Sequence, residues 1–126
     1  MRVFKNPWFE KFARKQDIGD DVLREAVGRA EEGLIDADLG GGVIKQRVAR
    51  EGRGKSGGFR TVILFRAGLR AIFVFGFAKS EQANLSAADL KTFRRAAKVA
   101  FGLSDAAMDA EAEAGRLAKV IYDKDL

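Results

Sequence analysis

A glycine- and arginine-rich stretch, AREGRGKSGGFR at residues 49–60, contains the Gly-Lys-Ser tripeptide that phosphate-binding loops use. Such a loop also needs a glycine five residues before its Gly-Lys pair, a strand before it and a helix after it. Ala49 occupies the glycine position here, and FRTVILF (59–65) is rich in β-branched and aromatic residues, which predicts a strand. No helix dipole would then point at a bound phosphate. The stretch is therefore not predicted to hold a nucleotide in this way.

The basic charge of the chain is concentrated around the same stretch. Residues 43–79 contain nine Lys and Arg residues against Glu51 alone, whereas the rest of the chain has 14 basic and 17 acidic residues. A basic patch confined to one segment favours a polyanion-binding surface on a domain whose other faces are neutral or acidic. A solvated charged edge is the alternative interpretation.

Composition limits the chemistry that is open to this chain. A length of 126 residues with 47% hydrophobic residues predicts a single globular domain over residues 1–126. It shows neither an apolar run of transmembrane length nor a signal-peptide pattern, so we expect a cytoplasmic protein that makes no membrane contact. Cysteine and histidine are both absent, so we expect no metal and no cofactor. Chemistry must fall to Lys, Arg, Asp, Glu, Ser or the single tyrosine, Tyr122.

The N-terminal part of the chain predicts one short strand and two helices. RVF (2–4) is a candidate edge strand, and a helix is expected after Asn6, which is a suitable N-cap. A second amphipathic helix is expected in DDVLREAVGRAEEGL (20–34), with Asp20 as its cap and Gly33 as its end. IDADLGGGV (35–43) is interpreted as a loop whose glycines mark a bend.

Three strands and two helices are expected in the remainder. The strands are VIKQRVAR, FRTVILFR and LRAIFVFGFAK, at residues 43–50, 59–66 and 69–79. The segment 86–122 is predicted to be helical, with one helix capped by Ser86 and a second, reaching residue 121, capped by Ser104.

The last two strands are short-linked and predict a hairpin. With Ala67 and Gly68 as the turn, Arg66 would face Leu69, Arg60 would face Phe75, and Lys79 would lie opposite Ser56.

This register brings cations and aromatic rings to one face near the end of the sheet. Because side chains alternate along a strand, Arg60, Phe75, Phe77 and Lys79 would project together, with Lys55 in the loop beside them. Both faces of the hairpin are apolar, so helices or a partner chain must cover each. The expected faces group Val62, Leu64 and Phe73 on one side and Ile63, Phe65 and Val74 on the other.

Several stretches also match a known family. GLIDADLGGGVIKQRVAREGRGKSGGFRTVILFR and AIFVFGFAKSEQANLS combine the motifs LGGG, KQR, GKSGG-x-R and FGFAKSE. Together these motifs resemble the RelE-type branch of the RelE/ParE superfamily of bacterial toxins. The similarity runs roughly from Trp8 to Leu103.

The resemblance implies the toxin of a type II toxin–antitoxin system. Its fold would be α+β, with a short N-terminal strand and two helices packed on a small twisted antiparallel sheet, followed by C-terminal helices. RelE-type toxins cut messenger RNA (mRNA) in the ribosomal A site without a metal, by attack of a ribose 2′-hydroxyl on the adjacent phosphate, and so arrest translation and growth. ParE-type toxins of the same fold poison DNA gyrase instead, and a noncatalytic RNA-binding module is a third possibility.

The implied partners follow from the same resemblance. They are a cognate antitoxin of helix-turn-helix type, the 70S ribosome with its mRNA, and operator DNA contacted through the antitoxin.

RNA cleavage by internal attack needs a base for the 2′-hydroxyl, positive charge on the phosphorane and an acid for the leaving 5′-oxygen. Arg60 matches the family's strand arginine and would clamp the scissile phosphate; a surface or antitoxin-pairing cation is the alternative. Lys55 is a candidate acid or base, because neighbouring cations would lower its pKa, although a solvated lysine is also possible. Lys79 matches a position where RelE-type toxins keep a basic catalytic residue.

The remaining candidates are accessory. Lys45, Arg47, Arg50 and Arg53 are expected to bind the RNA backbone. Phe77 could stack on a base, with core burial favoured as its alternative role. Glu81 is a candidate substitute for the histidine or tyrosine that other branches of the family carry, so the identity of the general base stays open. Its alternative role is a charge at the start of the following helix.

Overall fold

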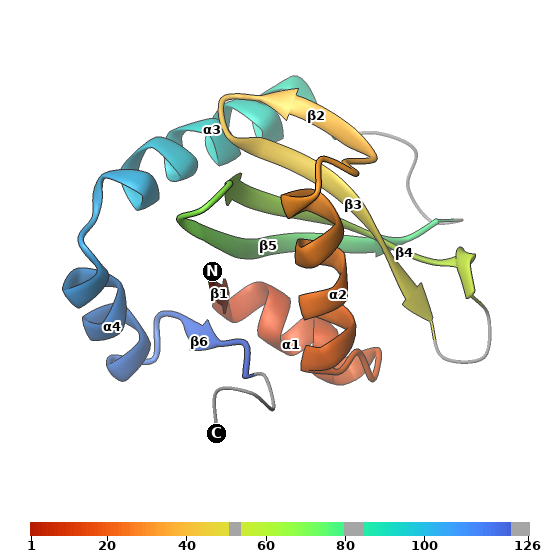
Figure 1. The fold of residues 1–126 in the computed structure, drawn as a ribbon, viewed down its shortest axis with the longest axis horizontal. Coiled ribbons are helices and arrows are strands. Elements are labelled where there is room, and N and C mark those ends of the chain that lie inside the picture. The colour runs from red at the N-terminus through yellow and green to blue at the C-terminus, as the bar shows by residue number, and fades with distance from the viewer. Residues whose placement is uncertain (51–53, 80–84, 122–126) are drawn as a thin grey trace.

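A six-stranded sheet with helices on both faces forms the molecule, seen in a computed structural model that describes residues 1–50, 54–79 and 85–121 (Figure 1). Its elements are β1 Arg2–Lys5, α1 Pro7–Lys15, α2 Asp20–Glu31, β2 Ala37–Gly40, β3 Val43–Arg50, β4 Gly54–Arg66, β5 Arg70–Ala78, α3 Ala87–Gly102, α4 Asp105–Glu113 and β6 Ala118–Lys119. The strands lie in the order β2-β3-β4-β5-β1-β6. This arrangement confirms the α+β class expected from the sequence. None of the helices in the described ranges is both long and apolar enough to cross a membrane.

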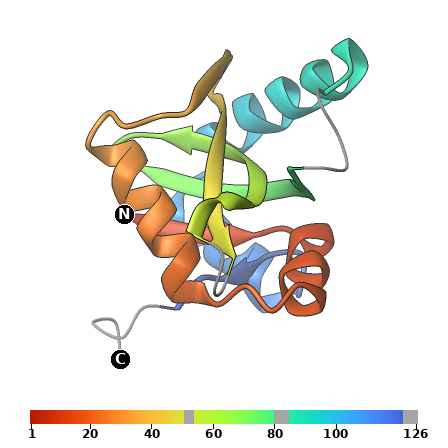
Figure 2. The same ribbon diagram turned by 90° about the vertical axis from the view of Figure 1, so that its right-hand side faces the viewer.

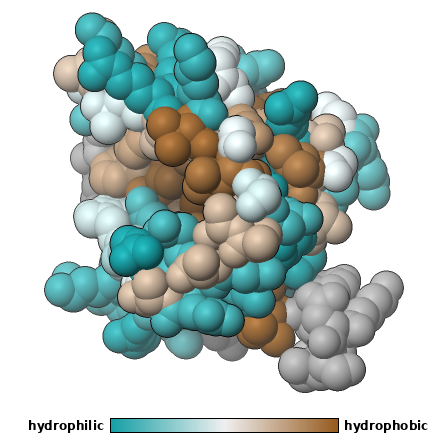
Figure 3. All heavy atoms as spheres, turned by 90° about the vertical axis from the view of Figure 1, so that its left-hand side faces the viewer, coloured by the Kyte–Doolittle hydropathy of each residue, from teal (hydrophilic) through white to brown (hydrophobic). Residues whose placement is uncertain are grey.

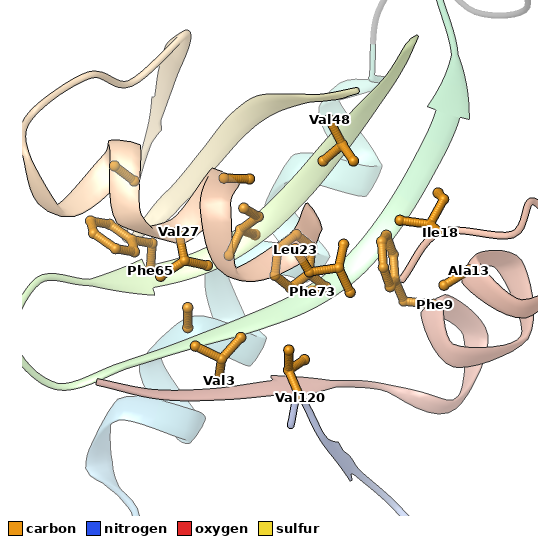
Figure 4. Close-up of a cluster of buried hydrophobic side chains, with 14 of the residues drawn as sticks. Val3, Phe9, Ala13, Ile18, Leu23, Val27, Val48, Phe65, Phe73 and Val120 are labelled. Atoms are coloured by element: carbon orange, nitrogen blue, oxygen red, sulfur yellow. The ribbon is translucent and has the colours of Figure 1, made fainter. Parts of the chain in front are cut away.

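The two N-terminal helices cover one face of the sheet. Phe9 of α1 and Leu23 and Val27 of α2 are almost fully buried against Ile63 and Phe73 of the central strands (Figure 4). The Asn6 side chain caps α1 by accepting a hydrogen bond from the Phe9 N–H. Burial on this scale stabilises each large apolar side chain by about 1.5–3 kcal/mol. This core fixes α1 against β5.

The second face is covered by the C-terminal helices. Ala97 and Ala100 of α3 and Met108 of α4 are buried against Val62 and Leu64 of β4. Ser86 and Ser104 cap these helices by accepting from backbone N–H groups three residues later, as expected. The prediction that both faces of the apolar hairpin need a cover is therefore confirmed.

The register of the β4–β5 hairpin differs from the expected one. The turn has three residues, so Arg66 pairs with Arg70 rather than Leu69. A β-bulge follows, because Val62 pairs with Phe75 while Ile63 pairs with Phe73. Beyond the bulge Arg60 pairs with Phe77, not Phe75 as predicted.

The bulge leaves Val74 as the extra residue, so Phe73 and Val74 each lie on the face opposite to the one expected. Phe73 packs with Ile63 on the α1 and α2 side, and Val74 packs with Val62 on the α3 and α4 side. The predicted grouping of Phe73 and Val74 was wrong, because a one-residue shift moves a side chain to the opposite face. Turn and bulge together shift the pairing by two residues, which keeps Arg60 on the same face as Phe77.

Three shorter segments also depart from expectation. β1 is not an edge strand: it lies between β5, with which it is parallel, and β6. The stretch 35–43 was expected to be a loop but contains β2, and its glycines form the turn into β3. The final helix ends at Glu113, because Val120 joins the core and donates its N–H to the Val3 carbonyl.

A buried arginine joins the hairpin to both C-terminal helices. Arg70 is 2% exposed, and its Nη1 donates to the Ala100 and Leu103 carbonyl oxygens at 2.8 and 2.9 Å. Its Nη2 lies 2.9 Å from Asp105 Oδ1 in the first turn of α4. Arg70 therefore satisfies the last carbonyls of α3 and positions the start of α4.

We predict that Arg70→Ala lowers the free energy of unfolding by about 3 kcal/mol, because buried carbonyls and a carboxylate lose their donor. Arg66→Ala is the matched control, since Arg66 is the cross-strand partner of Arg70 but is exposed. Urea unfolding followed by circular dichroism measures both variants. Equal, small effects would show that Arg70 does not anchor the helices.

Candidate functional site

Cations and aromatic rings share one face of the sheet, toward the end that lies opposite the β4–β5 turn. Arg47, Arg60 and Phe77 form one row across β3, β4 and β5, and Lys45, Val62 and Phe75 form the next. Residues paired across strands lie on the same face of a sheet. This face is the one that α3 covers, and Figure 2 shows the first turns of α3 extending past the sheet. Lys45, Arg47 and Arg60 on this face are only half-buried, so the cover is incomplete beside them.

Arg60 makes no side-chain hydrogen bond or ion pair within the part of the chain that the structure describes. Its side chain is half-buried, and its Nη1 is inaccessible to solvent yet has no hydrogen-bond partner among the residues that the structure describes. A buried donor without a partner costs about 1–3 kcal/mol, and more when it is charged. An anion that accepted this hydrogen bond would recover that energy.

Arg47, the neighbour of Arg60 in its row, is already paired. Its backbone N–H donates to Asp36 Oδ2 at 2.6 Å, and its Nη2 lies 3.3 Å from Asp36 Oδ1. Arg29 adds a weaker contact, with its Nη1 3.9 Å from Asp36 Oδ2. Burial opposes ionisation of Asp36, but the hydrogen bonds from Arg47 and the charges of Arg47 and Arg29 outweigh it and lower the pKa of Asp36. Asp36 therefore holds Arg47 in place and offsets part of its charge.

Gln46, between the two cations of the KQR motif, has a structural role that the sequence did not reveal. It is fully buried on the opposite face, and its Nε2 donates to the Ala26 and Leu34 carbonyl oxygens at 3.0 and 3.1 Å. Its Oε1 accepts from the Asp36 N–H at 2.8 Å. Alternation along β3 then points Lys45 and Arg47 toward the candidate site. The available signal was a polar residue on the same strand face as the apolar Ile44 and Val48.

The Gly-Lys-Ser tripeptide lies in a strand and not in a loop. Gly54 begins β4 and pairs with Arg50, whereas Phe59 pairs with Val48, so the register shifts between these two pairs. No helix follows it, which agrees with the rejection of a nucleotide-binding loop. Lys55 is therefore a strand residue, contrary to the expected loop.

The other predicted residues divide between described and undescribed parts of the chain. Lys79 is exposed directly after β5, two residues beyond the partner of Arg60. Phe77 is 5% exposed, which agrees with its alternative role in the core. The Lys55 and Arg50 side chains, together with Arg53 and Glu81, lie outside the described part. The meeting of Lys55, Arg60 and Lys79 at one phosphate stays a prediction.

A hollow lies beside the turn of the β4–β5 hairpin, at the end away from Arg60. It has a volume of about 540 Å³, and its lining includes Phe65 and Phe101 with Arg66, Arg94 and Lys98. Figure 3 shows the left-hand side of Figure 1, on which apolar residues gather within a hydrophilic surround. Arg66 and Arg60 are at opposite ends of the paired part of β4, so this hollow is separate from the candidate site.

The structure is a small α+β domain that carries several cations at one end of its sheet. The chain belongs to the RelE toxin family: residues 1–120 match the family described as the RelE toxin of the RelE/RelB toxin–antitoxin system. We found no significant match among curated proteins. The family match confirms the resemblance seen in the sequence. The family implies a cognate antitoxin as a partner.

We predict that Asp36→Asn destabilises the protein at neutral pH and that the loss shrinks in acid. The folded-state pKa of Asp36 is lowered, so its stabilising contribution is complete above the unfolded value of 3.8 and is lost as the pH falls through the lower folded value. Urea unfolding of wild type and variant at pH 7, 5 and 3 measures this difference. Glu31→Gln, at an exposed carboxylate that ends α2, is the control. A difference that stays constant over this range would contradict the proposed coupling of Asp36 to Arg47.

Proposed function

We propose that this toxin is an endoribonuclease that cuts mRNA on the ribosome without a metal ion and so arrests translation. The observation that carries the proposal is that Arg60 Nη1, on a cationic sheet face, has no hydrogen-bond partner among the described residues. The family match supports it, because toxins of this family are generally known as endoribonucleases. A guanidinium that the fold does not need is suited to a bound phosphate.

The proposed reaction is attack of a ribose 2′-oxygen on the adjacent phosphorus. The new bond joins the 2′-oxygen to phosphorus, and the bond that breaks joins phosphorus to the 5′-oxygen of the next nucleotide. The proton of the 2′-hydroxyl passes to a general base, and a general acid protonates the leaving 5′-oxygen. The products are a 2′,3′-cyclic phosphate and a free 5′-hydroxyl. Positive charge held at the nonbridging oxygens lowers the barrier.

We assign roles to the cations on this basis. Arg60 would hold the nonbridging oxygens, because its planar fork can donate to two of them and stays charged. Lys55 and Lys79 would exchange the protons, with Glu81 as a further candidate for the base. The backbone of mRNA or ribosomal RNA would be bound by Lys45, Arg47, Arg50 and Arg53.

The antitoxin would act by covering this face. We propose acidic or apolar side chains on the antitoxin, because an open cation cluster otherwise binds RNA without selection. A helix-turn-helix antitoxin would also carry the complex to operator DNA. Ribosomal activity would place the toxin in the cytoplasm.

The test is induction of the toxin without its antitoxin, followed by mapping of 5′-hydroxyl ends on translated and untranslated messages. We predict ribosome-dependent cuts whose downstream fragments carry a 5′-hydroxyl and whose upstream fragments end in a 2′,3′-cyclic phosphate. Arg60→Ala should lower the cutting rate by about 100-fold or more, as loss of a transition-state donor does. Lys55→Ala and Lys79→Ala should also lower it while the proteins still fold.

Arg66→Ala is the control, because Arg66 lies six residues along the same strand, at its other end, and should cut normally. DNA damage with intact mRNA would instead identify a gyrase poison. Salt-sensitive RNA binding without cut ends would identify a noncatalytic RNA-binding module. Either result would overturn the proposed nuclease.

A further inference from the structure

A groove runs between α1 and the part of β5 that carries Phe75 and Phe77. It has a volume of about 470 Å³, and its lining includes Trp8, Phe12, Lys11 and Lys15 with the two β5 aromatic residues. The volume lies in the range of small-molecule sites. β1 pairs with β5 only as far as Phe73, so the groove follows β5 beyond that ladder.

The aromatic wall of the groove is both fixed and partly open. Trp8 stacks on Phe12 with ring centroids 5.3 Å apart, and it packs against Phe75 at 4.6 Å. Gly76 permits this approach, because a Cβ there would lie 2.6 Å from the Phe12 ring. Trp8 nevertheless stays 45% exposed, which is unusual for the largest apolar side chain of a domain.

The charged rim of the groove is cationic. Trp8, Lys11 and Lys15 recur at helical spacing and lie along one side of α1, and both lysines are exposed. None of the described residues that line the groove is acidic. Glu10, the acidic residue of α1, is paired with Arg14 at 2.6 Å and does not line the groove. An exposed indole beside unopposed ammonium groups fits a ligand that has both a flat ring and negative charge.

The groove is continuous with the candidate site. Phe77 lines the groove and is the cross-strand partner of Arg60, and Lys79 follows two residues later. A chain of phosphates and bases that passes Arg60 can therefore enter the groove alongside Phe77.

We propose that this groove binds single-stranded RNA next to the cleavage site, with a base stacked on Trp8 and phosphates bound by Lys11 and Lys15. The inference rests on the proposed function for the identity of the strand. Stacking on aromatic rings tolerates any base, so the groove adds affinity and positions the strand without reading its sequence.

Trp8 is the single tryptophan of the chain and reports on the groove directly. The probe is a 2′-O-methylated RNA of about ten nucleotides, a length typical of single-strand sites, which cannot undergo internal attack. We expect saturable quenching of tryptophan emission when this RNA is added to the full chain. By fluorescence anisotropy, Trp8→Ala should weaken binding by about 5- to 150-fold, whereas Trp8→Phe should retain most of it.

The two lysines are tested through salt dependence. Lys11→Ser with Lys15→Ser should reduce the slope of log affinity against log salt by about 1.4, or about 0.7 for each lost phosphate contact. Arg14→Ser with Lys98→Ser removes the same charge outside the groove and should leave the slope nearly unchanged.

The outcomes separate this inference from the proposed function. If Trp8→Ala leaves RNA affinity unchanged while Arg60→Ala still abolishes cutting, the groove proposal fails and the nuclease stands. If wild type makes no cuts but its RNA binding depends on Trp8, the nuclease fails and the groove proposal stands. Loss of antitoxin binding by Trp8→Ala with unchanged RNA affinity would assign the groove to a protein partner and overturn the proposal.

Discussion

The whole structure depends on a central strand pair that is apolar on both faces. Because β4 and β5 bury side chains on either side, a one-residue shift exchanges the two cores, and their register is therefore tightly constrained. The bulge at Val74 sets that register. It places Phe73 in the core formed with α1 and α2, and it leaves Arg60 and Phe77 on the face that α3 covers only in part. The candidate site lies where this second core ends.

Much of this arrangement could be predicted from the sequence because its signals are local. Helix caps such as Asn6 and Ser86, and the β-branched runs of the strands, depend on neighbouring residues alone. The bulge and the parallel pairing of β1 with β5 could not be predicted, because they arise from packing between distant segments. The exposure of Trp8 could not be predicted for the same reason: helical periodicity does not show how far a neighbouring strand extends.

The charge pattern indicates a basic segment but does not distinguish the roles of its cations. Arg70 belongs to the basic segment, yet it is buried and anchors α3 and α4. Arg47 is held by Asp36, which lies outside the basic segment 43–79. Arg60 differs from both because no hydrogen bond or ion pair joins its side chain to another residue that the structure describes. A count of charges does not show which cations are paired. The positions of the acceptors around each side chain distinguish cations that stabilise the fold from those that could bind a ligand.

We propose that Arg60 binds a phosphate of the RNA that is cut. The most direct measurement is a structure of the toxin on a ribosome whose A-site mRNA carries 2′-O-methyl groups, so that internal attack is blocked. The account predicts Arg60 nitrogens within about 3 Å of the nonbridging oxygens of one mRNA phosphate, the usual length of a charge-assisted hydrogen bond. A structure in which Arg60 instead pairs with ribosomal or toxin groups, away from the message, would contradict it.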